Sequence, residues 1–159
     1  MSSLLISGML IGAGATLAMD LWAILLNRAF GQPLPNWGFV GRWVGHLPRG
    51  RFVHSAIAEA DHVANETALG WTFHYAVGIA YGLLFLAIVG SGWMAAPTFL
   101  SAWIFALITI GAGWFILQPG LGLGIAASRT PAPWVVRGHN ILGHTAFALG
   151  LWATALVIG

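Results

Sequence analysis

The chain has 159 residues, of which 58% are hydrophobic and only 6% are charged, and its mean hydropathy is +0.85. A soluble domain needs a far more charged surface, so this composition indicates a membrane protein. The formal net charge is only +2, which gives no reason to expect nucleic-acid binding. The chain has no cysteine, and this excludes disulfides, thiolate metal sites and a cysteine nucleophile.

Four apolar stretches each come close to the roughly 20 residues that a membrane-spanning helix requires. They cover about residues 4–26, 70–90, 97–117 and 139–158. The first has no basic region before it and no cleavage site after it, so we expect a retained helix and not a signal peptide. The sequence therefore predicts an all-α polytopic membrane protein, in which residues 1–159 form a single integral membrane domain built as a four-helix bundle.

All six arginines lie in two of the connections between these stretches. The connection between the first and second stretch holds Arg28, Arg42, Arg49 and Arg51, and the one between the third and fourth holds Arg129 and Arg137. Cytoplasmic loops of membrane proteins are enriched in positive residues. We therefore expect both connections to face the cytoplasm, and both termini and the short turn at 90–96 to face outward.

Asp20 is the most informative residue, because it lies inside an apolar stretch that is otherwise uncharged. It is roughly 9 Å from the inner end of that stretch at 1.5 Å per residue. His74 and His144 lie at a similar depth in the second and fourth stretches, and Gln118 and Asn140 lie at the same side. Ionisable residues are costly in hydrocarbon and turn toward the bundle interior. We therefore expect Asp20, His74 and His144 to converge in the inner leaflet.

This polar layer suits three classes of function. Carboxylate and imidazole donors from Asp20, His74 and His144 fit a divalent metal such as zinc, or a proton relay, in a small transporter. Alternatively, His74 and His144 hold haem or a metal in a subunit of a membrane enzyme. In the third class, a structural or accessory protein, the layer serves helix packing alone. Besides the lipid bilayer, the expected partners are further copies in a homo-oligomer or a larger membrane complex.

The first inner connection, residues 27–69, is too polar to span a membrane and too apolar to be disordered, so we expect it to lie on the bilayer surface. Within residues 36–47 apolar side chains recur at helical spacing, with Arg42 and His46 opposite them, which predicts an interfacial amphipathic helix. Residues 53–66 show a second amphipathic pattern. Glu66 ends this pattern beside the second span, where it is placed to reach the polar layer near His74.

Glu59 and His62 form an E-x-x-H pair of the kind that supplies ligands to di-iron centres in four-helix bundles. Such a centre draws on four carboxylates and two histidines from four helices, whereas this chain has only four acids and Asp61 points away from the polar face, so a solvated helix face is the better interpretation. The second inner connection has alternating glycines but lacks the lysine of a phosphate-binding loop. We expect it to be a re-entrant or surface-lying loop.

Two further patterns concern organisation. The segments PLPNWGFVGR from Pro33 and PAPWVVRG from Pro131 each precede a span that has a histidine near its start. This similarity predicts a parallel two-span repeat, residues 1–90 and 97–159, and transporters often bind substrate between such repeats. Small-residue pairs at Gly8/Gly12 and Gly78/Gly82 predict close helix packing.

The segments ATLAMDLW, FGQPLPNWGFVGRW, GWTFHYAVGIAYG, LQPGLGLGIAASRTP and GHTAFALGLW cover nearly the whole chain. Together they resemble an uncharacterised bacterial family of small inner-membrane proteins, domain of unknown function 2938. The resemblance implies a multi-pass protein of the bacterial inner membrane. It implies no activity, and it transfers no catalytic residues to this chain.

Overall fold

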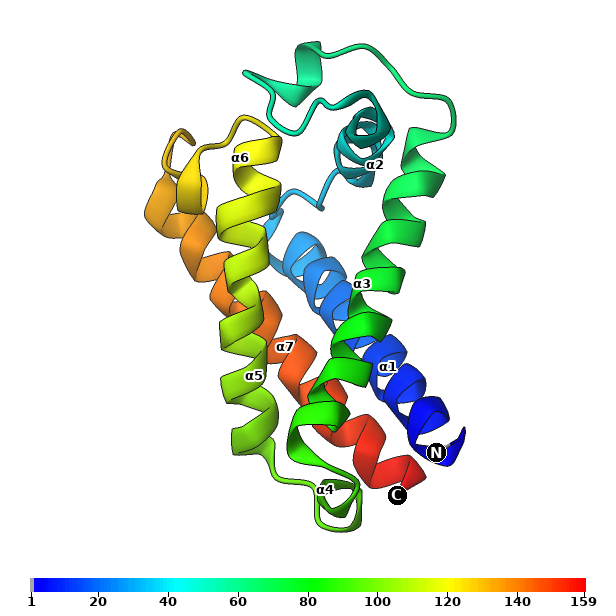
Figure 1. The fold of residues 1–159 in the computed structure, drawn as a ribbon. Helices are drawn as coiled ribbons and strands as arrows, with labels where there is room; N and C mark the ends of the chain where they lie inside the picture. Colours follow the sequence, from blue (N-terminus) through cyan, green and yellow to red (C-terminus); the bar gives the residue numbers. More distant parts are fainter. Residues whose placement is uncertain (1) are drawn as a thin grey trace. The chain divides into compact units, whose positions relative to one another are not determined.

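The computed structural model describes residues 2–159, and its long helices fall on the expected spans (Figure 1). They are α1 (Ser2–Phe30), α3 (Glu66–Val89), α5 (Phe99–Ala112) and α7 (Pro133–Ile158). The π-helical turn Gly113–Leu117 extends α5 into α6 (Gln118–Gly120). Residues 2–159 therefore contain four helices long and apolar enough to cross a membrane, and the prediction of an all-α membrane protein is confirmed.

The remaining elements are short. They are α2 (Trp37–His46), α4 (Gly92–Ala95) and three 3₁₀ turns at Leu47–Arg49, Ile57–Glu59 and Ile125–Ala127. The chain divides into two compact units. Unit 1 comprises Met1–Leu34, Tyr75–Ile108 and Leu142–Gly159, and unit 2 comprises Pro35–His74 and Thr109–Ile141. These units do not follow the expected two-span repeat, which stays a prediction.

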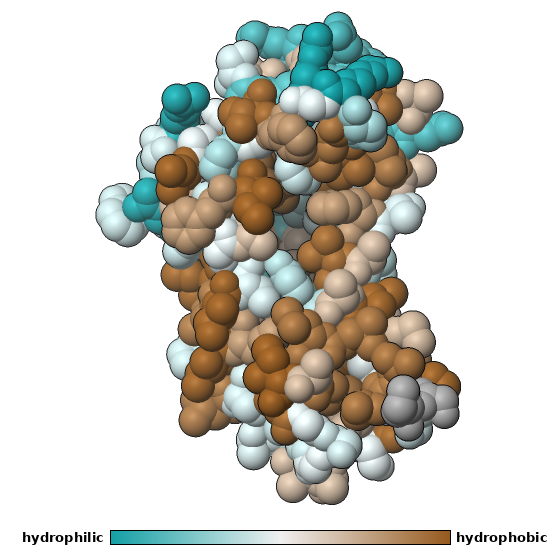
Figure 2. Space-filling view, viewed as in Figure 1, coloured by the Kyte–Doolittle hydropathy of each residue, from teal (hydrophilic) through white to brown (hydrophobic). Residues whose placement is uncertain are grey.

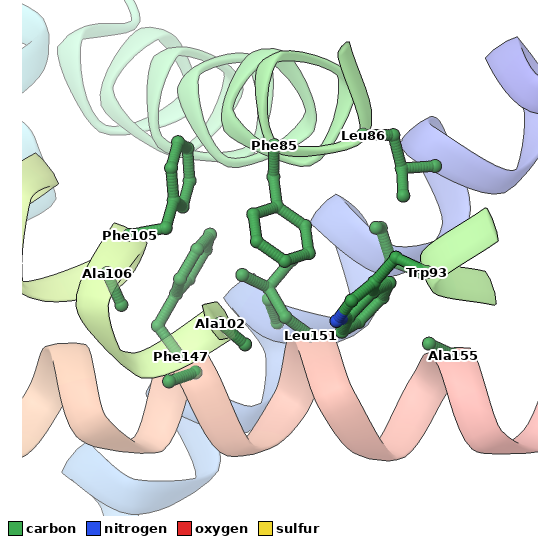
Figure 3. Close-up of a cluster of buried hydrophobic side chains, with 12 residues drawn as sticks. Phe85, Leu86, Trp93, Ala102, Phe105, Ala106, Phe147, Leu151 and Ala155 are labelled. Carbon is green, nitrogen blue, oxygen red and sulfur yellow. The ribbon is translucent and has the colours of Figure 1, made fainter. Parts of the chain in front are cut away.

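The core of unit 1 is aromatic where α3, α4, α5 and α7 meet (Figure 3). Phe85 is fully buried, and its ring centroid lies 4.7 Å from that of Trp93 and 5.2 Å from that of Phe105. The Phe85 and Trp93 rings meet edge to face. Aromatic pairs of this kind contribute about 0.5–1.5 kcal/mol each beyond the area they bury. This cluster therefore ties the elements of unit 1 together at the end where the C-terminus lies (Figure 1).

Small residues let α1 approach its neighbours closely in unit 1. A Cβ atom added at Gly12 would lie 2.5 Å from the carbonyl oxygen of Gly78 on α3, and one added at Gly150 would lie 2.6 Å from the Cα atom of Ala15. The predicted close packing of the glycine pairs is confirmed. Large apolar side chains point outward, as Figure 2 shows, and Ile108 is 71% exposed. Small residues at close helix contacts, together with large apolar residues that face outward, are typical of helices that face lipid.

In unit 2, α2 crosses the beginning of α3 at two glycines. A Cβ atom at Gly41 would meet the carbonyl of Glu66, and one at Gly70 would meet the carbonyl of Trp37. The predicted helix exists, but its polar face does not point to solvent. Arg42 is 3% exposed and His46 is fully buried, because residues 47–65 fold back over this face.

The prediction of a second amphipathic helix over residues 53–66 is wrong. The segment contains only the 3₁₀ turn Ile57–Glu59 before α3 begins. The carbonyl oxygens of Ile57, Ala58 and Ala60 accept hydrogen bonds from Nη1 of Arg42, at 3.0, 3.1 and 3.2 Å. These contacts fix an open turn around one buried guanidinium and leave the polar side chains exposed, His62 at 80%.

Candidate functional site

Asp20 lies inside α1, about ten residues, or roughly 15 Å, before the end of the helix at Phe30. Its carboxylate oxygen Oδ2 accepts a hydrogen bond of 3.0 Å from the hydroxyl group of Tyr75 on α3. Both residues belong to unit 1. Tyr75 was not among the residues predicted from the sequence, although it directly follows His74 and therefore lies at a similar depth in the second span.

The chemistry of this pair allows two protonation states. A tyrosine hydroxyl donates to a carboxylate, and it accepts from a carboxylic acid once its own hydrogen turns away. The contact between Asp20 and Tyr75 is therefore compatible with either form of a carboxyl group. An arginine partner, which has only donors, would favour the ionised state alone.

His144 is held by a backbone contact in unit 1. Its ring atom Nδ1 lies 2.8 Å from the carbonyl oxygen of Ala106 on α5. Because a carbonyl only accepts, Nδ1 carries the hydrogen, and the acceptor atom of the neutral ring is Nε2. One residue further on, the hydroxyl of Thr145 accepts from Nε1 of Trp103 at 3.1 Å. The polar residues of α7 thus link it to α5 within the membrane-spanning part.

His74 and Glu66 both lie in unit 2, and each has an identified partner there. The ring of His74 stacks on Trp37, with centroids 3.9 Å apart and an interplanar angle of 27°. Glu66 binds Arg42 through two parallel contacts, Nε to Oε2 at 2.9 Å and Nη2 to Oε1 at 2.8 Å. Fork-like arginine–carboxylate pairs are among the strongest hydrogen bonds in proteins. Glu66 therefore anchors the start of α3 to α2.

Arg42 is the centre of a larger network. Besides Glu66 and the three backbone carbonyls, its Nη2 atom contacts Nδ1 of His62 at 2.9 Å. Hydrogen bonding to Glu66 raises the pKa of Arg42, and this outweighs the burial that lowers it. A buried charge is tolerated only when it is paired and hydrogen-bonded. The network accounts for Arg42 as a structural residue that organises residues 57–66.

The structure brings Gln118 and Asn140 together in unit 2. Nε2 of Gln118 donates to Oδ1 of Asn140 at 2.9 Å, and Nε1 of Trp114 donates to the same oxygen at 2.9 Å. The side-chain oxygen of Gln118, Oε1, is buried and has no hydrogen-bond partner among residues 2–159. Trp114 lies on the π-helical turn, and such turns occur frequently at functional sites.

The expected ligand residues divide between the two units. Asp20 and His144 belong to unit 1, and His74, Glu66, Gln118 and Asn140 to unit 2. The convergence of Asp20, His74 and His144 therefore stays a prediction. Within residues 2–159, no group of three or more histidine, aspartate or glutamate side chains is arranged to hold a metal ion.

Comparison with known proteins extends the sequence resemblance. A family model described as protein of unknown function (DUF2938) matches residues 9–158. Neither the comparison with curated proteins nor that with solved structures gave a match. Because the family model covers nearly the whole chain, the protein belongs to the DUF2938 family of uncharacterised proteins.

Proposed function

We propose that the protein is a small transport protein of the bacterial inner membrane in which Asp20 reversibly binds a proton. The observation that carries the proposal is the 3.0 Å hydrogen bond between the Asp20 carboxylate and the hydroxyl of Tyr75. An ionisable residue inside a membrane-spanning helix indicates function by default. Its partner here accommodates both the carboxylate and the carboxylic acid.

The partner also favours a proton over a divalent metal ion. Zinc sites in proteins use cysteine, histidine, aspartate and glutamate ligands. Tyrosine is not among these ligands. The hydroxyl of Tyr75 instead forms a hydrogen bond with the Asp20 carboxylate, and this contact is suited to proton exchange.

The proposal extends the proton path from Asp20 to two histidines. His74 lies about 12 Å along α3 from its beginning at Glu66, and His144 about 17 Å along α7 from Pro133. Both distances are similar to the roughly 15 Å that separate Asp20 from the end of α1. Imidazole changes charge between about pH 5 and 8, which suits transfer to and from a carboxylate. We propose His74 and His144 as relay residues.

The proposal includes an orientation and an assembly. The arginine-rich connections face the cytoplasm, by the positive-inside rule, and both termini face outward. Four spans leave little room for an aqueous pathway inside one chain, so the transporter acts as a homo-oligomer. Reporter fusions at Gly159 and in the connection at Arg49 are expected to give opposite signals. Equal signals would contradict the orientation.

The proposal is tested by proton flux into liposomes that contain the purified protein and an internal pH-sensitive dye. Asp20→Asn keeps the size and hydrogen-bonding capacity of the side chain but cannot titrate. We expect a flux in the unmodified protein that Asp20→Asn abolishes. The matched control is Asp61→Asn, whose side chain is 81% exposed outside the spans and which should leave the flux unchanged.

Two outcomes would refute proton transport through Asp20. One is a flux in Asp20→Asn equal to that of the unmodified protein. The other is a flux in the unmodified protein no larger than that of protein-free liposomes. Circular dichroism of each variant in detergent shows that the helices have formed, so that loss of flux is not loss of fold.

A further inference from the structure

A pair of histidines in unit 2 forms a directed hydrogen-bond chain that the proposed function does not use. His46 ends α2 and is fully buried, and His54 lies in the connection that follows. Nδ1 of His46 lies 2.8 Å from Nε2 of His54, and Nδ1 of His54 lies 2.9 Å from the carbonyl oxygen of Gly120. These two hydrogen bonds therefore link the connection between α2 and α3 to the end of α6.

The carbonyl of Gly120 fixes the direction of both hydrogen bonds. Because it only accepts, Nδ1 of His54 must carry a hydrogen, and Nε2 of the neutral His54 ring is then an acceptor. Nδ1 of His46 must donate to that acceptor, which leaves Nε2 of the neutral His46 ring unprotonated. This Nε2 atom is buried and has no hydrogen-bond partner among residues 2–159. It is a basic nitrogen enclosed in the protein.

The same contacts hold two backbone segments side by side. The amide of His54 donates to the carbonyl of Gly120 at 3.1 Å, and the amide of Ile57 donates to the carbonyl of Leu121 at 3.1 Å. A Cβ atom at Gly122 would collide with the carbonyl of Ser55, so the segments touch without intervening side chains. Residues 54–57 and 120–122, joined by the His46–His54 chain, are here called the histidine latch.

We propose that the histidine latch is a second, pH-responsive proton site, and that proton uptake by the His46–His54 pair releases residues 54–57 from residues 120–122. The first proton turns Nε2 of His46 from an unprotonated atom into a buried charged donor. A second proton places two N–H groups face to face across the 2.8 Å contact. Charging the buried His46 ring is costly, and a doubly protonated pair cannot keep the contact between the two rings, so proton uptake favours separation of the segments. This inference is independent of Asp20.

The charged groups around His46 set the sign of the pH response. Burial lowers the pKa of His46, the neighbouring His54 lowers it further, and Arg51 and Arg49 act in the same direction. The backbone carbonyl of Asp61 acts in the opposite direction and raises the pKa of His46. On α2 itself, Arg42 lies one turn before His46 and is paired with Glu66, while Arg51 contacts the Asp61 carboxylate at 3.4 Å.

A histidine with a lowered pKa binds protons more tightly in the open state than in the closed state. The closed latch is therefore fully stable above the ordinary histidine pKa of about 6.5 and loses stability as the pH falls below that value. Above pH 7 the latch is expected to stay closed. On acidification to about pH 5 the open population should rise.

Hydrogen exchange at the amides of His54 and Ile57 measures this opening directly. After correction for the pH dependence of intrinsic exchange, we expect protection at these amides to fall on the order of tenfold between pH 7.5 and pH 5. Amides in the middle of α2 serve as the internal reference and should keep their protection. Equal protection of the His54 and Ile57 amides at both pH values would overturn the proposal.

His46→Asn is the variant that separates the latch from general acid sensitivity. The Asn amide keeps a donor for His54 and offers an oxygen when His54 is protonated, but it has no titratable nitrogen. We expect the two amides to stay protected at pH 5 in this variant. The control His139→Gln removes a histidine outside the latch and should retain the pH response. A pH response in His46→Asn as large as in the unmodified protein would refute the role of His46.

A second measurement needs no variant. Nitrogen NMR of the histidine rings in detergent at pH 7.5 should show both His46 and His54 protonated at Nδ1 and unprotonated at Nε2. Finding the hydrogen on Nε2 of His54 would contradict the direction of the chain. Neither NMR result bears on proton flux through Asp20. Failure of the latch and failure of the proposed function are therefore distinguishable.

Discussion

Among residues 2–159, Glu66 and Asp20 lie on helices long and apolar enough to span a membrane, and the partners of their carboxylates differ. Glu66 is held by two parallel contacts from the buried guanidinium of Arg42, at 2.8 and 2.9 Å. Asp20 accepts a 3.0 Å hydrogen bond from the hydroxyl of Tyr75. The first partner supports only the ionised carboxylate, whereas the second supports both protonation states. The same functional group therefore serves structure in one unit and is suited to proton exchange in the other.

The largest effect is expected from removing the positive partner of Glu66. Arg42→Met removes the guanidinium that pairs with the half-buried carboxylate of Glu66 and releases the carbonyls of Ile57, Ala58 and Ala60, so the variant should lose about 3 kcal/mol of stability. The free energy of unfolding in mixed detergent micelles measures the loss. If Arg42→Met were as stable as the unmodified protein, Glu66 would not be a structural carboxylate.

A matched arginine serves as the control for this variant. Arg51 contacts Asp61 at 3.4 Å, and its side chain is 59% exposed. Exposed ion pairs contribute little, so Arg51→Ala should change stability by less than about 1 kcal/mol. A large loss in Arg51→Ala would mean that the first connection is sensitive to any loss of charge.

The next effect concerns the packing that brings Asp20 beside Tyr75. Gly12→Ala places a Cβ atom 2.5 Å from the carbonyl of Gly78, which should force α1 away from α3 at a cost of about 1–3 kcal/mol. Proton flux should fall with it, while the Glu66–Arg42 contact in unit 2 stays intact. Gly92→Ala has open space around the added atom and is the control. Unfolding and flux assays on both variants would show whether the packing of α1 supports the site.

A smaller effect is expected from the tyrosine hydroxyl. Tyr75→Phe removes one hydrogen bond to Asp20 and should lower stability by about 0.5–1.5 kcal/mol. Proton flux should fall because the carboxylate loses the group that fits both its protonation states. Tyr81→Phe is the matched control, since Tyr81 packs edge-on against Phe105 and Phe147. Equal flux in Tyr75→Phe and Tyr81→Phe would make the phenol of Tyr75 irrelevant to transport.

The features that the sequence predicts well are those with a regular period. Apolar runs of the right length predict the spans, and glycines four residues apart predict that α1 packs tightly on α3. The pattern at residues 36–47 also predicts helix α2. Periodicity does not reveal which face of α2 is covered, so the burial of Arg42 and His46 was not predicted.

The other features that the sequence did not predict depend on contacts between segments distant in sequence. Residues 53–66 have an amphipathic pattern, but the guanidinium of Arg42 draws their carbonyls into a turn, and this contact joins residues distant in sequence. Tyr75 lies on a different helix from Asp20, 55 residues away, so no local pattern connects them. The histidine latch depends on Gly120, a residue with no side chain to mark it.

The central claim is that Asp20 exchanges a proton inside the membrane, and infrared difference spectroscopy of the protein in lipid tests it most directly. The band of a protonated carboxyl group should appear on acidification, and one component of it should be missing in Asp20→Asn. Asp61→Asn should remove a different component, that of a solvent-exposed carboxyl group. A spectrum of Asp20→Asn identical to that of the unmodified protein would contradict the account.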